Sequence, residues 1–424
     1  MQNIYKEYLS SSQVCTDTRA IVQDCIFFAL KGDNFNGNHF VNQAIELGAR
    51  IAIVDEETAQ IPGKTMLVKD CLNSLQDLAK YHRNVLTIPI IGLTGSNGKT
   101  TTKELIAAVL STKYKVFATT GNLNNHIGVP LSILSINKNH EVAIIEMGAN
   151  HQKEIEFLAA LAKPNYGLIT NIGRAHLEGF GGIKGVLKGK KELYDYLTEV
   201  KGSVFINQSD AILTEIEPTE TNNYYYGGKS SISGEILSNS ELLNVSITIN
   251  NKHSTIQTKL VGNYNLNNIL AAACIGNHFK VNLAEIKLGL ENYVPDNHRS
   301  QFIETEKNQI ILDAYNANPS SVEAALLNFS QRKEINKLVI LGDMLELGSN
   351  SSLEHESIFQ RLIKLDLEAI LVGKEFKKLQ QNQFICFENA ATALDHLQKN
   401  IISDTAILIK GSRGIQLELV LSAL

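Results

Sequence analysis

The sequence has little of the chemistry on which several classes of protein depend. Its 424 residues include five cysteines, which are scattered and form no CxxC pair: Cys15, Cys25, Cys71, Cys274 and Cys386. Such a small, odd and scattered set predicts neither a disulfide framework nor a cysteine-based zinc site. The formal net charge is only −5, so bulk electrostatics favours neither a nucleic acid nor an anionic membrane as a partner.

Long apolar segments are also missing. No uncharged apolar run approaches the ~18 residues that a membrane span needs. Residues 1–6 lack the basic start and the apolar core of a signal peptide. We therefore expect a soluble, reduced, cytoplasmic protein. The length of 424 residues predicts roughly two to four domains.

The alternation of short β runs with helical stretches predicts an α/β protein of three domains. A small mixed α/β domain is expected over 1–86, with a strand at 51–54 and a helix at 74–82. Over 87–297 we expect a P-loop ATPase-like parallel sheet with helices on both faces. Its strands are predicted at 88–93, 143–146, 168–171 and 204–207, followed by an antiparallel hairpin of 245–249 and 255–260 attached to the sheet and by a helix at 267–278.

The last part, 298–424, predicts a Rossmann-like, doubly wound domain. Its strands are expected at 310–313, 338–341, 369–372, 385–387 and 406–410, with helices between them.

A glycine-rich loop carries the most specific signal. Directly after the apolar run 88–93 the chain reads Thr94-Gly95-Ser96-Asn97-Gly98-Lys99-Thr100, and a helical pattern begins at Thr101. Such a loop brings backbone N–H groups close to phosphate oxygens, and the helix N-terminus adds positive potential. Lys99 can reach the β/γ-phosphates and the Thr100 hydroxyl can hold Mg²⁺, so the loop predicts ATP binding. The strict motif has glycine where this chain has Leu93, but the strand before the loop and the helix after it disfavour an ordinary turn.

Further polar residues follow predicted strands. Glu146 ends the strand 143–146, where a carboxylate can share Mg²⁺ with Thr100, although it can also be an ordinary strand-end residue. His176 follows the strand 168–171 and is either a metal ligand or a surface residue. On local evidence, the basic helical stretch 185–192 is a solvated cationic face, and the polar stretches 262–268 and 313–320 can simply start helices.

In this order, the motifs resemble those of the ATP-dependent Mur ligases of peptidoglycan synthesis over essentially the whole chain. The shared series is 94–100, 146–148, 171–176, 190–192, 265–268, Arg299, 313–319 and 410–413. The stretches 30–37, 121–130, 315–319 and 341–348 are similar to the branch that adds D-alanyl-D-alanine to UDP-N-acetylmuramoyl-tripeptide. The resemblance implies an ADP-forming amide ligase, expected to be a monomer, whose third domain closes over the dipeptide and the nucleotide.

The resemblance also implies nucleotide and metal ligands. The predicted ATP contacts are Gly95, Ser96, Asn97, Gly98, Lys99, Thr100 and Thr101, with Asn268 at the adenine and Arg299 and Asp313 at the ribose and phosphate side. Thr100 and Glu146 would hold one Mg²⁺; Glu146, His176 and a carbamylated Lys190 would hold a second, which reverses the local interpretation of the basic stretch. Lys99, His176 and Lys190 are the implied catalytic residues.

Substrate contacts are implied in all three domains. Those for the uridine diphosphate are Thr16, Asp17, Thr18 and Arg19; those for the stem peptide are Asn122, Asn124 and Asn125; those for the dipeptide and nucleotide are Asn316, Asn318, Lys410, Ser412 and Arg413. Tyr264 departs from the family, which often has His before this asparagine, so the stacking of the base stays open.

Two other functions remain in view. A folylpolyglutamate synthase-like ligase shares the phosphate loop and the carbamate site, but should lack residues 16–19 and the whole first domain. A nucleotide-binding regulatory module without catalysis should have lost Lys99, Glu146, His176 or Lys190, and all four are present.

Overall fold

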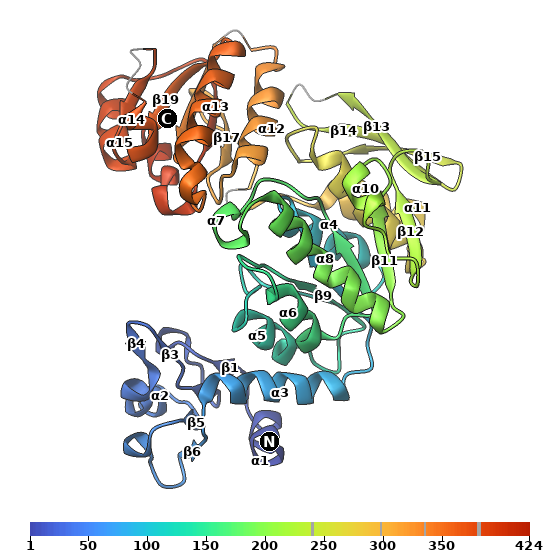
Figure 1. The fold of residues 1–424 in the computed structure, drawn as a ribbon, viewed down its shortest axis with the longest axis vertical. Coiled ribbons are helices and arrows are strands. Elements are labelled where there is room, and N and C mark those ends of the chain that lie inside the picture. Colours follow the sequence, from blue (N-terminus) through green and yellow to red (C-terminus); the bar gives the residue numbers. More distant parts are fainter. Residues whose placement is uncertain (239–240, 297–298, 335, 380–382) are drawn as a thin grey trace.

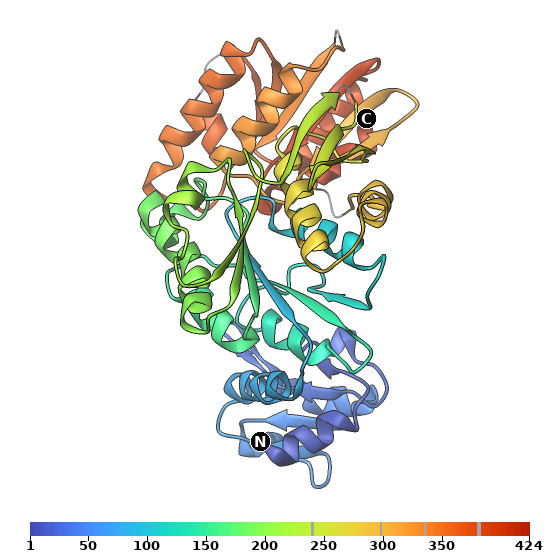
Figure 2. The ribbon, with the colours of Figure 1, turned by 90° about the vertical axis from the view of Figure 1, so that its right-hand side faces the viewer.

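Three α/β domains follow one another along the long axis of the molecule in the computed structural model (Figure 1, Figure 2). The structure describes residues 1–238, 241–296, 299–334, 336–379 and 383–424. The boundary expected between 297 and 298 lies outside these residues. Within the described ranges, no helix is both long and apolar enough to cross a bilayer.

The N-terminal domain is built on a four-stranded parallel sheet of order β1-β2-β5-β6. Its elements are α1 (Gln2–Leu9), β1 (Val14–Cys15), β2 (Ile26–Phe28), β3 (Lys31–Gly32), β4 (Phe35–Asn36), α2 (Val41–Glu46), β5 (Ile51–Val54), β6 (Thr65–Leu67) and α3 (Cys71–Val85). The strand predicted at 51–54 is confirmed, and the helix predicted at 74–82 is the middle of α3. The Asp70 side chain starts α3 earlier than predicted, because its Oδ1 accepts a hydrogen bond from the Asn73 amide at 2.7 Å.

The central domain carries a six-stranded sheet of order β12-β11-β10-β7-β9-β8, in which every pair is parallel. Its strands are β7 (Ile90–Thr94), β8 (Val116–Ala118), β9 (Val142–Glu146), β10 (Tyr166–Ile169), β11 (Ser203–Asn207) and β12 (Asn222–Tyr226). Its helices are α4 (Lys99–Leu110), α5 (Gly128–Ser135), α6 (Glu154–Ala162), α7 (Leu177–Phe180), α8 (Ile183–Glu199), α9 (Ala211–Glu215), α10 (Asn265–His278) and α11 (Leu283–Asn292).

Alternate residues of β7 enter different cores, as the two-residue period of a strand requires. Ile91 and Leu93 belong to the core that includes the buried residues of α4 and α10, whereas Ile90 belongs to the core that includes those of α6 and α8. The predicted parallel sheet with helices on both faces is therefore confirmed.

The predicted hairpin is present but is not attached to the central sheet. β14 (Asn244–Ile249) and β15 (Lys252–Gln257) join β13 (Ile232–Ser238) in a separate antiparallel sheet. Asn250 and Asn251, the two turn residues, both have positive φ, at 49° and 66°. The two-residue turns that favour a β-hairpin require this backbone conformation. The buried alternate residues of β14 pack in the core of α4 and α10, so helix packing, not strand pairing, places the hairpin.

The C-terminal domain carries a six-stranded mixed sheet of order β16-β17-β21-β18-β19-β20. Its strands are β16 (Gln301–Glu304), β17 (Asn308–Asp313), β18 (Lys337–Gly342), β19 (Glu368–Val372), β20 (Ile385–Phe387) and β21 (Thr405–Lys410). Its helices are α12 (Pro319–Ser330), α13 (Ser351–Lys364), α14 (Lys374–Lys378) and α15 (Ala390–Lys399). The five predicted strands are confirmed; β16 was not predicted. It is an antiparallel edge strand without a fully buried residue, so its sequence shows no apolar run.

The side chain of Arg83 fixes α3 to the central domain. Arg83 is 7% exposed, and its guanidinium donates to Ala162 O at 2.8 Å, Lys163 O at 2.8 Å and Leu86 O at 3.0 Å. Because α6 ends at Ala162, the cation satisfies carbonyl groups that the helix leaves without partners, at the negative end of the helix dipole.

We therefore expect Arg83→Met to destabilise the protein by about 2 kcal/mol or more, since it leaves these buried carbonyls unpaired. The measurement is thermal and denaturant unfolding. Arg50→Met is the matched control, because Arg50 makes an exposed ion pair with Glu7, and exposed pairs contribute little. Equal stability of the two variants would contradict this role of Arg83.

Candidate active site between the central and C-terminal domains

A cavity of about 780 Å³ lies between the central and C-terminal domains. The structure brings most of the predicted site residues into its lining: Ser96, Asn97, Gly98, Lys99, Thr100, Thr101, Asn122, Asn124, Asn125, Glu146, His176, Asn268, Arg299, Asp313, Asn316, Asn318 and Lys410. A cavity of this size suits a nucleotide-sized ligand.

Four further predicted residues, Gly95, Lys190, Ser412 and Arg413, are not part of the lining. Two of them form hydrogen bonds with residues of the lining. Gly95 O accepts from Lys99 Nζ, and Lys190 Nζ donates to Ala149 O. Ser412 Oγ accepts from the Leu345 amide at 2.9 Å, and the Arg413 guanidinium lies 5.5 Å from the centre of the Tyr315 ring.

The predicted uridine site is not brought to the cavity. Thr16–Arg19 lies in the N-terminal domain, at the opposite end of the molecule from the C-terminal domain (Figure 1). Arg19 is 89% exposed and pairs with Asp17 at 2.6 Å. Hydrogen bonds from Arg19 lower the pKa of Asp17 to about 2, so the pair presents a charged, solvent-facing surface.

The glycine-rich loop has the backbone that phosphate binding requires. It joins β7 to α4, and Gly95 and Gly98 have φ of 145° and 75°. A Cβ on Gly95 would lie 2.0 Å from Thr170 Oγ1, so only glycine fits there. Lys99 Nζ folds back on its own loop and donates to Gly95 O at 2.7 Å and to Ser96 O at 3.2 Å. Burial lowers the pKa of Lys99, and the nearby Glu146 partly offsets this effect.

Glu146 offers a carboxylate oxygen that is short of partners. The residue is 1% exposed, and its Oε1 accepts from Asn124 Nδ2 at 2.8 Å. Its Oε2 has no hydrogen bond from any described residue, and the nearest cation, Lys103 Nζ, is 3.9 Å away. A buried carboxylate oxygen in this state fits a divalent cation, and the buried hydroxyl of Thr100 lines the same cavity. Lys103 was not predicted as a site residue, although it lies one helical turn after Lys99.

Lys190 is buried, so a solvated cationic face is the wrong description of its position. It is fully buried on α8, its Nζ donates to Ala149 O at 3.2 Å, and it lies 5.0 Å from the centre of the Phe180 ring. Burial, followed by repulsion from Lys99, lowers the pKa of Lys190 well below its ordinary value. A neutral amine is the form that reacts with CO₂ to give a carbamate. Lys188, two residues earlier, is exposed as the local pattern predicted.

His176 is held by the C-terminal domain. It has a left-handed backbone, with φ of 52°, and its Nδ1 is hydrogen-bonded to Glu346 Oε2. Because this bond occupies Nδ1, Nε2 is the ring nitrogen left for a metal ion. Glu346 was not predicted as a site residue, although it lies in the stretch 341–348, which carries part of the family resemblance.

No group of three His, Cys, Asp or Glu side chains suited to a metal occurs among the residues that the structure describes. A metal ion in this cavity therefore needs hydroxyl, phosphate or carbamate oxygens in addition to Glu146 and His176.

Two cationic side chains of the C-terminal domain line the cavity and have different partners. Lys410 is 2% exposed, and its Nζ donates to Asp313 Oδ2 at 2.6 Å and to Asn316 O at 3.3 Å. Arg299 stacks on Tyr315, with 3.6 Å between its guanidinium carbon and the ring centre. The buried Nε of Arg299 has no acceptor among the described residues, so this donor is available to a ligand.

Asn268, the predicted adenine contact, packs against α4. Its Oδ1 accepts from Thr102 Oγ1 at 3.0 Å, and its Nδ2 donates to Asn265 Oδ1 at 2.7 Å. Tyr264, the departure from the family pattern, bonds to Ser300 Oγ at 2.8 Å. Its ring therefore sits against the C-terminal domain.

Comparison with known proteins gives a consistent result along the whole chain. Three family models match: Mur ligase family, catalytic domain, at 11–83; Mur ligase middle domain at 93–276; and Mur ligase, glutamate ligase domain, at 298–413. The chain is 35% identical over 418 residues to the UDP-N-acetylmuramoyl-tripeptide–D-alanyl-D-alanine ligase of Bacillus subtilis, covering 96% of this chain and 91% of that protein.

Solved structures show the same fold. Crystal structure I of MurF from Acinetobacter baumannii matches with a TM-score of 0.88 and 30% identity, covering 99% of this chain and 97% of that one. The MurF ligase from Thermotoga maritima in complex with ADP matches with a TM-score of 0.86 and 25% identity, covering 98% and 97%.

The close contact at Gly95 generates a prediction about nucleotide binding. Gly95→Ala should weaken ATP binding about tenfold or more, because the new methyl group displaces the loop amides from the phosphates. Titration calorimetry with ATP or ADP checks it. Gly63→Ala is the matched control: Gly63 also has positive φ, at 72°, but a Cβ there meets nothing within 4 Å. Unchanged affinity in the Gly95 variant would exclude this loop as the phosphate site.

Proposed function

The chain belongs to the Mur ligase family, and we propose that it adds D-alanyl-D-alanine to UDP-N-acetylmuramoyl-tripeptide in cytoplasmic peptidoglycan precursor synthesis. The reaction forms an amide and cleaves ATP to ADP and phosphate. The observation that carries the proposal is the cavity in which the glycine-rich loop, Glu146 and the Asp313–Lys410 pair meet. Full-length similarity to a ligase of that name supports it.

Each domain has a separate task in this proposal. Residues 1–86 bind the UDP-sugar, with Thr16–Arg19 at the uridine diphosphate. Residues 87–297 bind ATP, and Asn122, Asn124 and Asn125 lie where the stem peptide reaches the cavity. Residues 298–424 bind the dipeptide and complete the nucleotide site. The match of the family's first domain to residues 11–83 argues against a folylpolyglutamate synthase-like ligase, for which no such domain was expected.

The chemistry follows from the poor reactivity of a carboxylate. The terminal carboxylate of the stem peptide first attacks the γ-phosphorus of ATP, and ADP leaves. The amine of D-alanyl-D-alanine then attacks the acyl phosphate, and the tetrahedral adduct expels phosphate. Lys99 neutralises charge on the transferred phosphoryl group. Closure of the C-terminal domain brings the reactants together and shields the acyl phosphate from water.

Mg²⁺ fits the donor set around Glu146. Thr100 and Glu146 would hold one ion; Glu146, His176 and a carbamylated Lys190 would hold a second. The Glu146 Oε2 atom, which accepts no hydrogen bond from a described residue, and the buried Lys190 amine, whose pKa is lowered by burial, support this assignment. When bound, the ions would neutralise negative charge on the phosphates and the carboxylate.

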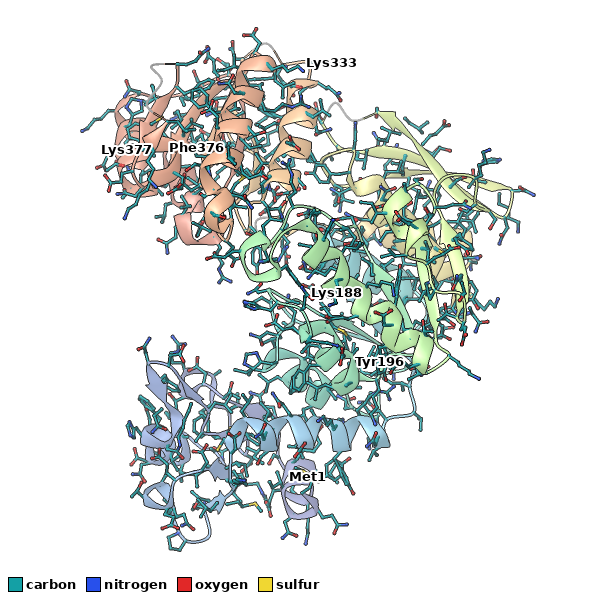
Figure 3. The ribbon with its side chains drawn as sticks, in the orientation of Figure 1. Met1, Lys188, Tyr196, Lys333, Phe376 and Lys377 are labelled. Carbon is teal, nitrogen blue, oxygen red and sulfur yellow. The ribbon has the colours of Figure 1, made fainter. Side chains whose placement is uncertain are left out.

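The Lys190 carbamate has a direct test. Lys190→Ala should be nearly inactive, because the second ion loses an oxygen ligand, and short carboxylates should partly restore activity by filling the gap. Lys188→Ala, on the same helix but exposed (Figure 3), should behave as wild type. A ¹³C NMR spectrum of active enzyme in ¹³C-bicarbonate should show a carbamate signal that Lys190→Ala lacks; its absence from the wild type would refute the modification.

The amine substrate tests the proposed function itself. At saturating ATP and tripeptide substrate, kcat/KM for D-Ala-D-Ala should exceed that for D-Ala, L-Ala-L-Ala, L-Lys or diaminopimelate by roughly 10²-fold or more. The reason is that a site built around paired polar contacts strongly rejects ligands that lack them. Preference for a free amino acid would identify a different step of the pathway. No phosphate release with any amine would identify a regulatory module.

A further inference from the structure

One arginine of the central domain reaches two helices of the C-terminal domain. Arg174 lies between β10 and α7, and its Nη2 donates to Glu323 Oε2 of α12 at 2.7 Å. Its Nη1 donates to Glu354 Oε2 of α13 at 2.8 Å. The backbone amide of Arg174 also donates to Ser320 Oγ at 2.9 Å. A single residue thus holds the start of α12 and the side chains of two helices.

The segment that carries Arg174 also holds the phosphate loop. Ser96 Oγ accepts from the Gly173 amide at 2.8 Å and donates to Gly173 O at 3.1 Å. The Asn97 amide donates to Asn171 Oδ1 at 3.0 Å. A Cβ on Gly173 would lie 3.2 Å from both Asn97 Nδ2 and Ser320 Oγ, so the loop and α12 approach each other closely at this point. A shift of α12 therefore reaches the phosphate loop through one short segment.

Arg174 itself stands outside the cavity. Among the described residues, the lining includes Gly173, His176 and Ser320 but not Arg174. Two cavity contacts across the domains flank it: Asn318 Nδ2 donates to Asn97 Oδ1 at 2.7 Å, and His176 pairs with Glu346. The guanidinium therefore acts on the lining through the residues beside it and not through the ligand.

The charges explain why an arginine suits this position. Glu323 and Glu354 come from different helices, and each would lose its hydrogen bond from the guanidinium if Arg174 were removed. The planar fork of arginine offers two donors to two separate carboxylates, which the single ammonium of lysine cannot match. The Arg174 side chain is 34% exposed and Glu354 is 15% exposed. The ion pairs of Arg174 are therefore accessible enough to solvent to break, and salt should weaken them.

We propose that Arg174 is a positioning residue that sets the C-terminal domain on the phosphate loop and thereby tunes the affinity for ATP and for the amine substrate. The inference rests on the proposed function for the identity of the amine, but not for the nucleotide. The N-terminal domain makes no contact with Arg174 among those described, so binding of the UDP-sugar is independent of it.

Steady-state kinetics of the full chain test this role. Arg174→Gln should raise KM for ATP and for D-Ala-D-Ala by roughly 5- to 20-fold, the loss of two charged hydrogen bonds discounted for partial exposure. KM for the UDP-tripeptide should not change. Arg174→Lys should recover part of the loss, because it can reach one carboxylate at a time. Lys377→Ala is the control: Lys377 pairs with Glu388 at 3.1 Å within the C-terminal domain, on the side away from the central domain (Figure 3).

ADP binding by calorimetry gives a second measurement that does not depend on ligase activity. Arg174→Gln should weaken ADP binding, and its effect should be non-additive with Glu323→Gln plus Glu354→Gln, because all three changes break the same contact. If ADP affinity depends on Arg174 but no amine is ligated by the wild type, the positioning role stands and the proposed function fails. Lower thermal stability with unchanged KM values and unchanged ADP affinity would show a merely structural ion pair and overturn the inference.

Discussion

The parallel pairing of the central sheet is the constraint on which the site depends. β10 pairs with β7 and β7 pairs with β9, all in one direction. Their carboxyl ends therefore lie side by side, although the segments that follow them are far apart in the sequence. The glycine-rich loop follows β7, Glu146 ends β9, and the segment with Asn171 and His176 follows β10. One topological rule thus assembles the glycine-rich loop, the Glu146 carboxylate and the segment that meets the C-terminal domain.

The lysines at this edge of the sheet differ in their anionic partners. Lys103 Nζ lies 3.7 Å from Glu104 Oε1 and 3.9 Å from Glu146 Oε2. Burial and the nearby Lys99 lower the pKa of Lys190, and Glu154 and Glu192 partly offset this effect. Buried cations of this kind are costly without anionic partners. Lys99 now satisfies its donors with carbonyls of its own loop. A polyphosphate would supply an anionic partner for Lys99, which favours the binding of ATP at this loop.

The sequence predicted those parts of the site that local structure determines. The strand, loop and helix around Lys99 are contiguous, and residue type alone marked Glu146 as a strand-end carboxylate. Lys190 shows the limit: its neighbours form a basic helical face, and only the packing of α8 on Phe180 and Ala149 decides that this one lysine is buried. The resemblance supplied what local pattern could not. The contacts of Arg174 and the pairing of His176 with Glu346 bring together residues about 150–180 positions apart. Neither segment contains a local pattern that predicts these contacts.

The two domain interfaces differ in their polar contacts, and the difference bears on which domain can move. One apolar core includes buried residues of all three domains, but the N-terminal domain also joins the central domain through buried hydrogen bonds, among them those of Arg83 and the bond from His82 Nε2 to Ile136 O at 2.8 Å. The C-terminal domain meets the central domain at the cavity through polar side-chain pairs, several of them partly exposed. Breaking buried hydrogen bonds leaves their donors and acceptors unpaired, whereas exposed ion pairs break and re-form at little cost. Rearrangement during turnover should therefore fall mainly on the C-terminal domain, with α3 and the N-terminal domain remaining fixed to the central sheet.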